Sequence, residues 1–297
     1  MTETTVHGRL PETDPMTDAD RLLVRSSVEQ TLGGGAPGED DRFRAVDDAD
    51  DDGSGFIRSM AAEAATMLEG KPADRILAWA AHVVPRFVLT SSFGAESAVL
   101  LHMASNVAPE VPVLFLDTGF HFDETLTFRK ELARSLGLTV LDLRPDLSVE
   151  QQARRLGPEL YRTDPDLCCQ QRKTIPLRRA LGSFDGWATG VRRGQTPERA
   201  ATPIVEARRH NERYLVKVAP LAGWTDDDVN TYLQAHDLPR HPLVEQGFSS
   251  IGCSPCTSRV EAGQDPRGGR WAAQGKSECG IHLAEDGLGT RANTTPG

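Results

Sequence analysis

Apolar residues recur along the chain at two different spacings, and each spacing predicts a different kind of element. A helical spacing begins near residue 56 and predicts helices over 56–68 and 74–83. The pattern then changes to short apolar runs that favour strands, at 86–90, 111–116 and 139–143. Helix-length segments separate these runs, at 96–105 and 123–136. Strands that alternate with helices predict a parallel sheet with helices on its faces, which is an α/β fold.

The second half of the chain continues this alternation and then loses it. A fourth strand is predicted at 186–189, with further extended pieces at 202–205 and 214–218. Thr225 can cap a helix that has three Asp residues in its first turn and that we expect to end near residue 235. Beyond Phe248 the chain is irregular and glycine-rich, yet it holds three of the five cysteines. The predicted parts are therefore an α/β domain over 56–245 and an irregular C-terminal segment over 246–297.

Residues 1–55 differ from the rest in composition. They are polar and acidic, with an Asp-rich run at 47–52, and they predict a disordered extension. The whole chain has a formal net charge of −10, which disfavours nucleic acid as a partner. The sequence contains no apolar run of membrane-spanning length and no signal-peptide pattern, so we expect a cytoplasmic protein without a membrane partner.

Polar turns follow the first two predicted strands. Between the first strand and the next helix lie Ser91, Ser92, Phe93, Gly94 and Ser97, and after the second strand lie Asp117 and Thr118. Ligands bind at the carboxyl ends of parallel strands, and a helix N-terminus presents N–H groups to an anion. These turns therefore predict a phosphate or sulfate site. Simple helix capping by the serines and a plain Asp-Thr-Gly turn are the alternatives.

The cysteines are the most specific feature of the sequence. Cys168 and Cys169 are adjacent, and Cys253 and Cys256 form a Cys-x-x-Cys pair. In a reducing compartment such thiols are metal ligands more often than disulfides, and four of them can hold zinc or an iron-sulfur cluster. Adjacent side chains reach one small ion only with strain, whereas a cubane offers separate iron corners, so the spacing favours a four-iron cluster. Four unrelated buried thiols are the alternative.

Cations and a fifth thiol complete the set of candidates. Basic residues follow the cysteine pair, the fourth strand and the Cys-x-x-Cys pair: Lys173, Arg192, Arg193, Arg267 and Arg270. Arg can bind phosphate or sulfate oxygens through two hydrogen bonds, so these residues predict an anionic substrate, although about half of them could be solvated surface residues. Cys279 has no apolar neighbourhood, and an exposed thiol near cations is a candidate nucleophile or an incidental surface cysteine.

Together these motifs resemble the assimilatory phosphosulfate reductases, which act on adenylyl sulfate (APS) or its 3′-phosphorylated form (PAPS). The resemblance runs from about residue 87 to residue 282 and rests on these motifs in order: 91–97, 116–119, Cys168-Cys169 with Arg172-Lys173, 190–193, 253–256, 269–271 and 278–282. It implies an adenine nucleotide α-hydrolase-like fold in which the serine loop is a PP-loop. It also implies the iron-sulfur branch of the family, which typically prefers APS.

The resemblance also implies roles for individual residues. Cys168, Cys169, Cys253 and Cys256 would ligate a [4Fe-4S] cluster, and Cys279 would be the nucleophile. Lys173, Arg267 and Arg270 would lie near the phosphosulfate. In the implied reaction, Cys279 takes the sulfo group from APS and releases AMP, and thioredoxin then releases sulfite, which serves cysteine biosynthesis.

Several points stay open at this level. The loop 91–97 partly resembles the PAPS-type loop, so PAPS or dual use is an alternative. No thioredoxin-like domain follows Cys279, so thioredoxin has to be a separate protein. More remote alternatives are an iron-sulfur tRNA sulfur-transfer enzyme and a nucleotide-binding redox sensor. The sequence leaves the oligomeric state open, a homo-oligomer included.

Overall fold

A computed structural model of the chain describes residues 53–261, 263–272, 274, 276 and 278–281. All of these belong to the unit Asp48–Gly297. The acidic segment expected to be disordered lies outside the described residues up to residue 52, as does His282 of the C-terminal motif. Within the described part of the chain, no helix combines the length and apolar character needed to cross a membrane.

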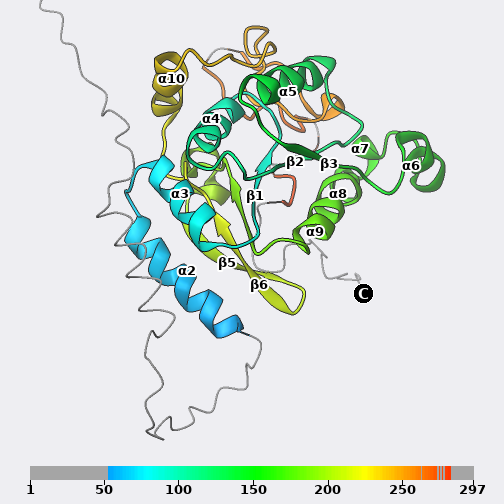
Figure 1. Cartoon of the computed structure of the whole chain (residues 1–297). Coiled ribbons are helices and arrows are strands. Elements are labelled where there is room, and N and C mark those ends of the chain that lie inside the picture. The colour runs from blue at the N-terminus through cyan, green and yellow to red at the C-terminus, as the bar shows by residue number, and fades with distance from the viewer. Residues whose placement is uncertain (1–52, 262, 273, 275, 277, 282–297) are drawn as a thin grey trace, which may run out of the picture. The chain divides into compact units, whose positions relative to one another are not determined.

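The centre of the fold is a six-stranded sheet with the strand order β3-β2-β1-β4-β6-β5 (Figure 1). Five strands run parallel: β1 (Phe87–Ser91), β2 (Val113–Leu116), β3 (Val140–Leu143), β4 (Gly186–Thr189) and β6 (Arg213–Val218). The apolar sequences of β1, β2 and β4 suit strands buried on both faces, whereas β3 is partly exposed. The predicted α/β fold with a mainly parallel sheet is confirmed, and these five strands lie within three residues of their predicted ends.

The edge strand β5 (Val205–His210) differs from the prediction. The extended piece expected at 202–205 only touches its first residue, and β5 runs antiparallel to β6 as a hairpin. Asn211 makes the turn with a φ of 56°, a left-handed conformation that Asn tolerates better than most residues. The polar side chains of β5 hide this strand from a search for apolar runs.

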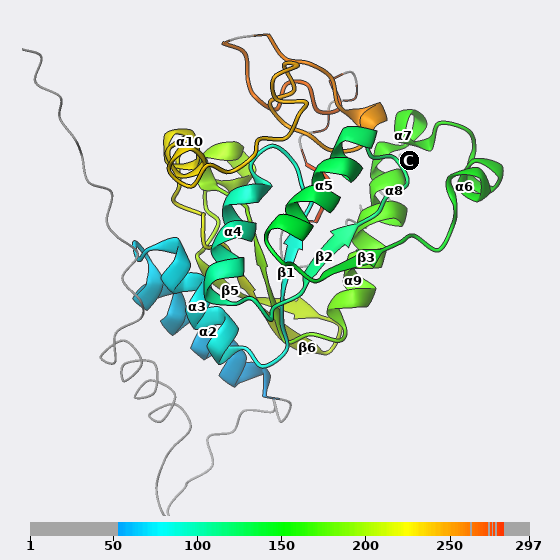
Figure 2. The same ribbon diagram turned by 45° about the horizontal axis from the view of Figure 1, so that its top comes forward.

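Helices cover both faces of the sheet. The predicted helices are α2 (Ser54–Leu68), α3 (Ala73–Val83), α4 (Ser97–Val107), α5 (Asp123–Ser135) and α10 (Asp226–Ala235). Right-handed crossovers place α4 and α5 on one face and α9 (Ile175–Leu181) on the other, as Figure 2 shows. On the α9 face, Leu177 and Leu181 pack against Val88 of β1 and Trp187 of β4.

A run of short helices between β3 and α9 carries the cysteine pair. It consists of α6 (Val149–Leu156), α7 (Leu160–Thr163), α8 (Pro165–Cys169) and a π-helical turn, Gln170–Thr174. Asp164 caps α8, since its side chain accepts a hydrogen bond from the Leu167 amide at 2.9 Å. The π turn follows the cysteines directly and holds both Arg172 and Lys173. Such turns occur often at functional sites.

The order in which the strands are added to the sheet reverses at its centre. From β1 the chain proceeds outward to β2 and β3, and it then returns to form β4 on the other side of β1. Ligands in open α/β sheets bind at this topological switch point, beyond the carboxyl ends of the strands. Figure 2 shows the segment that follows α10, in orange, at the end of the sheet to which the β1 and β2 arrowheads point.

Candidate functional site

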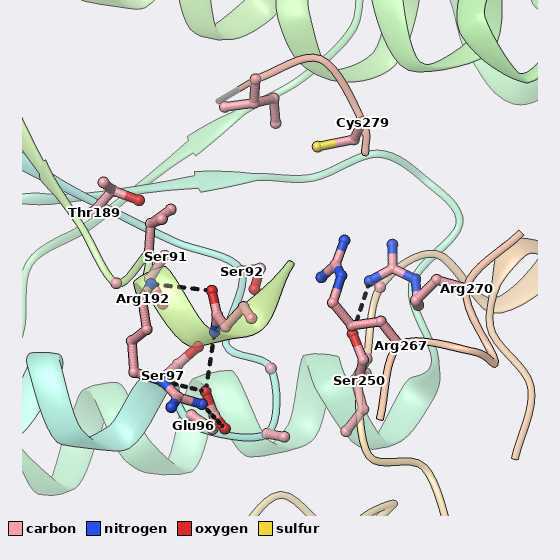
Figure 3. A pocket seen from close by; sticks show the side chains of 18 of the residues that line it. Ser91, Ser92, Glu96, Ser97, Thr189, Arg192, Ser250, Arg267, Arg270 and Cys279 are labelled. Atoms are coloured by element: carbon pink, nitrogen blue, oxygen red, sulfur yellow. Dashed lines mark hydrogen bonds and ion pairs between the residues drawn. The ribbon is translucent and has the colours of Figure 1, made fainter. Parts of the chain in front are cut away.

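A pocket of about 390 Å³ opens at the switch point (Figure 3). Its walls come from the turns after β1, β2 and β4, from the π turn and from the C-terminal segment. Eleven of the site residues predicted from the sequence line it: Ser91, Ser92, Gly94, Ser97, Thr118, Lys173, Arg192, Cys253, Arg267, Arg270 and Cys279. The structure therefore brings together candidates from five separate stretches of sequence.

The serine loop is shaped by its own backbone contacts. Ser91 Oγ accepts a hydrogen bond from the Phe93 amide at 3.1 Å, and Phe93 has a φ of 49°. The Phe93 ring is fully buried and packs edge-on against Phe115, with ring centroids 5.6 Å apart. Phe93 thus anchors the loop from below and does not line the pocket. A Cβ on Gly94 would lie 3.3 Å from the Ile251 carbonyl oxygen, so glycine suits this close approach.

Helix α4 presents its N-terminus to this loop. Its N-cap is Glu96, whose side chain makes no capping hydrogen bond within the described part of the chain. Ser92 and Ser97 line the pocket beside it. The positive end of the helix dipole therefore faces the pocket beside two hydroxyl groups, an arrangement that favours an anion.

The two residues after β2 have different surroundings. The Thr118 side chain is buried, and its Oγ1 lies 3.3 Å from Cys253 Sγ. Asp117 accepts a hydrogen bond from the Gly119 amide at 3.2 Å and forms an ion pair with Arg144 at 3.2 Å. Asp117 shapes the turn and does not line the pocket, which is the plain-turn alternative for this residue.

Arg192 lines the pocket, but its positive charge is paired with carboxylates of the protein itself. Arg192 is only 3% exposed and donates hydrogen bonds to Glu96 at 2.5 Å and to Asp226 at 2.6 Å. Burial opposes the charged form, but these two carboxylates outweigh it and raise the pKa of Arg192. Its guanidinium is therefore a structural link between α4 and α10.

Arg193, which the sequence predicts to bind substrate, does not line the pocket. It forms a two-pronged ion pair with Glu69, at 2.7 and 2.8 Å, and donates to the Thr202 carbonyl at 2.8 Å. These partners hold its side chain outside the pocket lining. An ion pair that joins β4 to the end of α2 gives it a structural role.

The opposite side of the pocket is cationic. Figure 3 shows the guanidinium groups of Arg267 and Arg270 on the same side as Cys279. Arg270 lies over the ring of the buried Trp271, with its Cζ 4.5 Å from the ring centroid. Lys173 Nζ lies 5.9 Å from the same centroid. Burial alone would lower the pKa of Lys173, but the negative charge of neighbouring thiolates at Cys253, Cys279 and Cys169 raises it, and the net shift is upward.

The four predicted metal ligands converge on a second, smaller cavity. Cys168 and Cys169 at the end of α8 line it together with Cys253 and Cys256. Among the described residues, no group of three or more His, Cys, Asp or Glu side chains is arranged to hold a single metal ion. Burial raises the pKa of Cys169 to about 12 and that of Cys256 to about 11. Lys173 and Cys253 line both cavities, so the two sites share a wall.

Cys279 is half-buried at the rim of the larger pocket, and all five cysteines are free thiols. Its neighbour Glu278 is buried and forms an ion pair with Arg199 at 2.6 Å. No individual role was predicted for Arg199, Glu278 or Trp271, although Trp271 and Glu278 belong to the motifs at 269–271 and 278–282 that carry the resemblance. Arg199 has no comparable signal in the sequence.

The fold and pocket define a class of protein: an α/β protein that binds an anionic ligand at a switch point, with a thiol at the rim of the site. Comparison with known proteins narrows this class. The phosphoadenosine phosphosulfate reductase domain family matches residues 86–259. The chain belongs to this family.

Individual relatives agree with this assignment. The adenosine 5′-phosphosulfate reductase of Streptomyces coelicolor is 43% identical over 227 residues, covering 76% of this chain and 94% of that protein. The enzyme of the same name from Chelativorans sp. is 48% identical over 193 residues, covering 65% of this chain and 77% of that protein. The crystal structure of phosphoadenylyl-sulfate (PAPS) reductase from Candida auris, a phosphate complex, has a TM-score of 0.60 at 26% identity and covers 68% of this chain and 97% of that one.

Proposed function

We propose that this chain reduces APS to sulfite and AMP in sulfate assimilation, with thioredoxin as the reductant. The observation that carries the proposal is the position of Cys279, a free thiol at the rim of a switch-point pocket whose near wall holds Lys173, Arg267 and Arg270. Cations at that wall can stabilise a thiolate and the negative charge of a phosphosulfate. Relatives that share most of this chain are named for the same substrate.

The first step is nucleophilic displacement at sulfur. The Cys279 thiolate attacks the sulfur of the sulfate group, an S–S bond forms, and the bond from sulfur to the bridging phosphate oxygen breaks. AMP leaves with the electron pair, and Cys279 becomes an S-sulfocysteine. Arg267, Arg270 and Lys173 would neutralise the charge that develops on the leaving phosphate.

The second step needs two electrons from a dithiol. One thioredoxin thiolate attacks the Cys279 sulfur, the S–S bond to the sulfo group breaks, and sulfite leaves with the electron pair. The second thioredoxin thiol then attacks the mixed disulfide and restores the Cys279 thiol. Thioredoxin is thereby oxidised to its disulfide, and the sulfur of sulfate is reduced to sulfite. Free thiols at all five cysteines fit a reducing, cytoplasmic location.

The arginines near β4 support APS over PAPS as the preferred substrate. Arg192 is saturated by two carboxylates, and Arg193 is held outside the pocket by Glu69. Neither guanidinium is available to neutralise an additional 3′-phosphate. The carboxylates of Glu96 and Asp226, which also line the pocket, would repel such a group at short range.

A [4Fe-4S] cluster is the cofactor that best fits the second cavity. Four thiols from two distant segments line one small cavity, which is the expected donor set for a cluster with separate iron corners. Cys168, Cys169, Cys253 and Cys256 would hold it. When bound, the cluster would supply charge that acts on the shared wall, where Lys173 lies between it and the substrate pocket.

The test of the proposed function is sulfite release by anaerobically purified protein with thioredoxin and thioredoxin reductase, with APS and PAPS offered in parallel. We expect turnover of APS well above that of PAPS. A Cys279→Ser variant should bind AMP normally and release no sulfite, because the serine hydroxyl is a poor nucleophile without a base. ATP consumption with tRNA would support sulfur transfer instead, and nucleotide binding without any sulfite release would support a sensor.

A further inference from the structure

Cys279 lies between two residues that hold its segment against the body of the protein. On one side, Glu278 is buried and both of its carboxylate oxygens accept hydrogen bonds from Arg199, at 2.6 and 2.7 Å. On the other side, Ile281 packs against the apolar cluster between α9 and the sheet. The Cys279 thiol therefore faces the pocket because its two flanks are fixed, one by charge and one by apolar contact.

Of these two contacts, the ion pair of Glu278 with Arg199 defines the geometry more closely than the packing of Ile281. Side-chain exposure is 10% for Arg199 and 3% for Glu278, so water competes little for this ion pair. Thr196 adds a hydrogen bond to the same carboxylate at 3.3 Å, and Arg267 approaches it at 3.5 Å. Charge-assisted, two-pronged pairs are strong and restrict geometry, which suits a contact that sets the position of a neighbouring group.

This ion pair is connected to the substrate loop. Arg199 donates to Gln195 Oε1 at 2.5 Å, and Gln195 donates to Glu96 at 3.2 Å. Glu96 is the N-cap of α4 and lines the pocket beside Ser92 and Ser97. One chain of hydrogen bonds thus joins the residue before Cys279 to the loop expected to receive the nucleotide.

We propose that Arg199 and Glu278 are positioning residues that dock the Cys279 segment for the transfer of the sulfo group. The inference rests on the proposed function. Attack on the bound phosphosulfate needs the Cys279 thiol at the pocket, where the ion pair of its neighbour Glu278 with Arg199 holds it.

The accessibility of Cys279 tests the docking contact directly. Glu278→Gln keeps the shape of the side chain and removes its charge, and Arg199→Gln removes the other partner. We expect a maleimide to modify Cys279 about tenfold faster in either variant, the ratio that loss of one charge-assisted hydrogen bond produces. The rate is read at the Cys279 peptide by mass spectrometry. The double variant should react no faster than either single variant, because both remove the same contact.

Glu69→Gln is the matched control, since it breaks the two-pronged pair with Arg193 that lies outside the pocket. Its Cys279 should react at the wild-type rate. Arg199→Lys keeps the positive charge but can make only one of the two hydrogen bonds to Glu278. It should give an intermediate rate of maleimide modification and serves as a second variant if Arg199→Gln does not fold. Unchanged maleimide rates in Glu278→Gln and Arg199→Lys would overturn the proposal.

A second readout separates positioning from simple loss of structure. In a single turnover with APS and no thioredoxin, Glu278→Gln should release AMP about tenfold more slowly while its Kd for AMP stays within about twofold of wild type. AMP release at the wild-type rate would overturn the positioning role. If wild-type protein releases no AMP from APS while the maleimide rates change as expected, the docking contact stands and the proposed reductase function fails.

Discussion

His241 offers a quantitative test of how the segment that follows α10 is fixed to the sheet. Its side chain is fully buried, its Nε2 lies 3.0 Å from Thr125 Oγ1 on α5, and its Nδ1 accepts a hydrogen bond from the Leu243 amide at 3.2 Å. The accepting Nδ1 requires the neutral ring. Burial lowers the pKa of His241 to about 4 and outweighs the opposing charge of Glu124.

This depressed pKa makes stability depend on pH in a defined direction. The unfolded chain protonates His241 near its ordinary pKa of about 6.5, whereas the native state resists protonation down to about pH 4. Its contribution is fully present above about pH 6.5 and is lost as the pH falls toward 4. At about 1.4 kcal/mol per pKa unit, the maximum loss in the free energy of unfolding is about 3 kcal/mol.

Urea denaturation between pH 8 and pH 5, followed by circular dichroism, measures this effect. The comparison is between wild type and His241→Gln, which cannot titrate, with both proteins in the same cluster state. We expect the stability advantage of wild type to shrink by about 2 kcal/mol over that range, because pH 5 lies about 1.5 units below the unfolded pKa. A constant difference between the two proteins would refute a neutral, buried His241.

Two glycines lead to further predictions. A Cβ on Gly252 would lie 2.5 Å from Cζ of Arg270, a flexible side chain, so Gly252→Ala should displace that guanidinium, raise the KM for APS about tenfold and leave the urea midpoint unchanged. An unchanged KM would remove Arg270 from the substrate site. On β4, a Cβ on Gly186 would lie 3.0 Å from Val216 Cβ and from Val84 Cγ1, so Gly186→Ala should lower the free energy of unfolding by about 1–3 kcal/mol in urea. Wild-type stability would contradict the observed pairing of Gly186 with Val216.

The sequence predicts those parts of the fold that are apolar and bounded by turns. Strands β1, β2 and β4 were visible because buried parallel strands have continuous apolar sequences. Strand β5 was not visible in this way, because it contains charged residues. Its Glu206 forms an ion pair with Lys217 on the neighbouring β6, and a local sequence pattern does not reveal such a pairing. The capping box of Ser148 and Gln151 could have revealed α6. The π turn has no comparable sequence signal.

Site residues could be predicted where their position at the end of a strand places them in the pocket. They were harder to predict where pairing with residues distant in sequence decides whether a side chain is available. Serines and a threonine at strand ends reach the pocket because parallel strands end at one edge of the sheet. Whether an arginine is available to a ligand depends on which acids fold against it. Arg192 and Glu96 are 96 residues apart in sequence, and Arg193 and Glu69 are 124 apart. A count of basic residues therefore overestimates the charge that the pocket offers.

The shared wall between the two cavities explains why the cysteine pair and the substrate site belong to one structure. Attack by a thiolate on a phosphosulfate brings two anions together, and their repulsion has to be offset before the S–S bond can form. Lys173 follows the cysteine pair within the π turn and, like Cys253, lines both cavities, so charge in the thiol cavity lies next to the substrate pocket. A change of charge at the four thiols should therefore alter the reactivity of Cys279 even though it is not one of them.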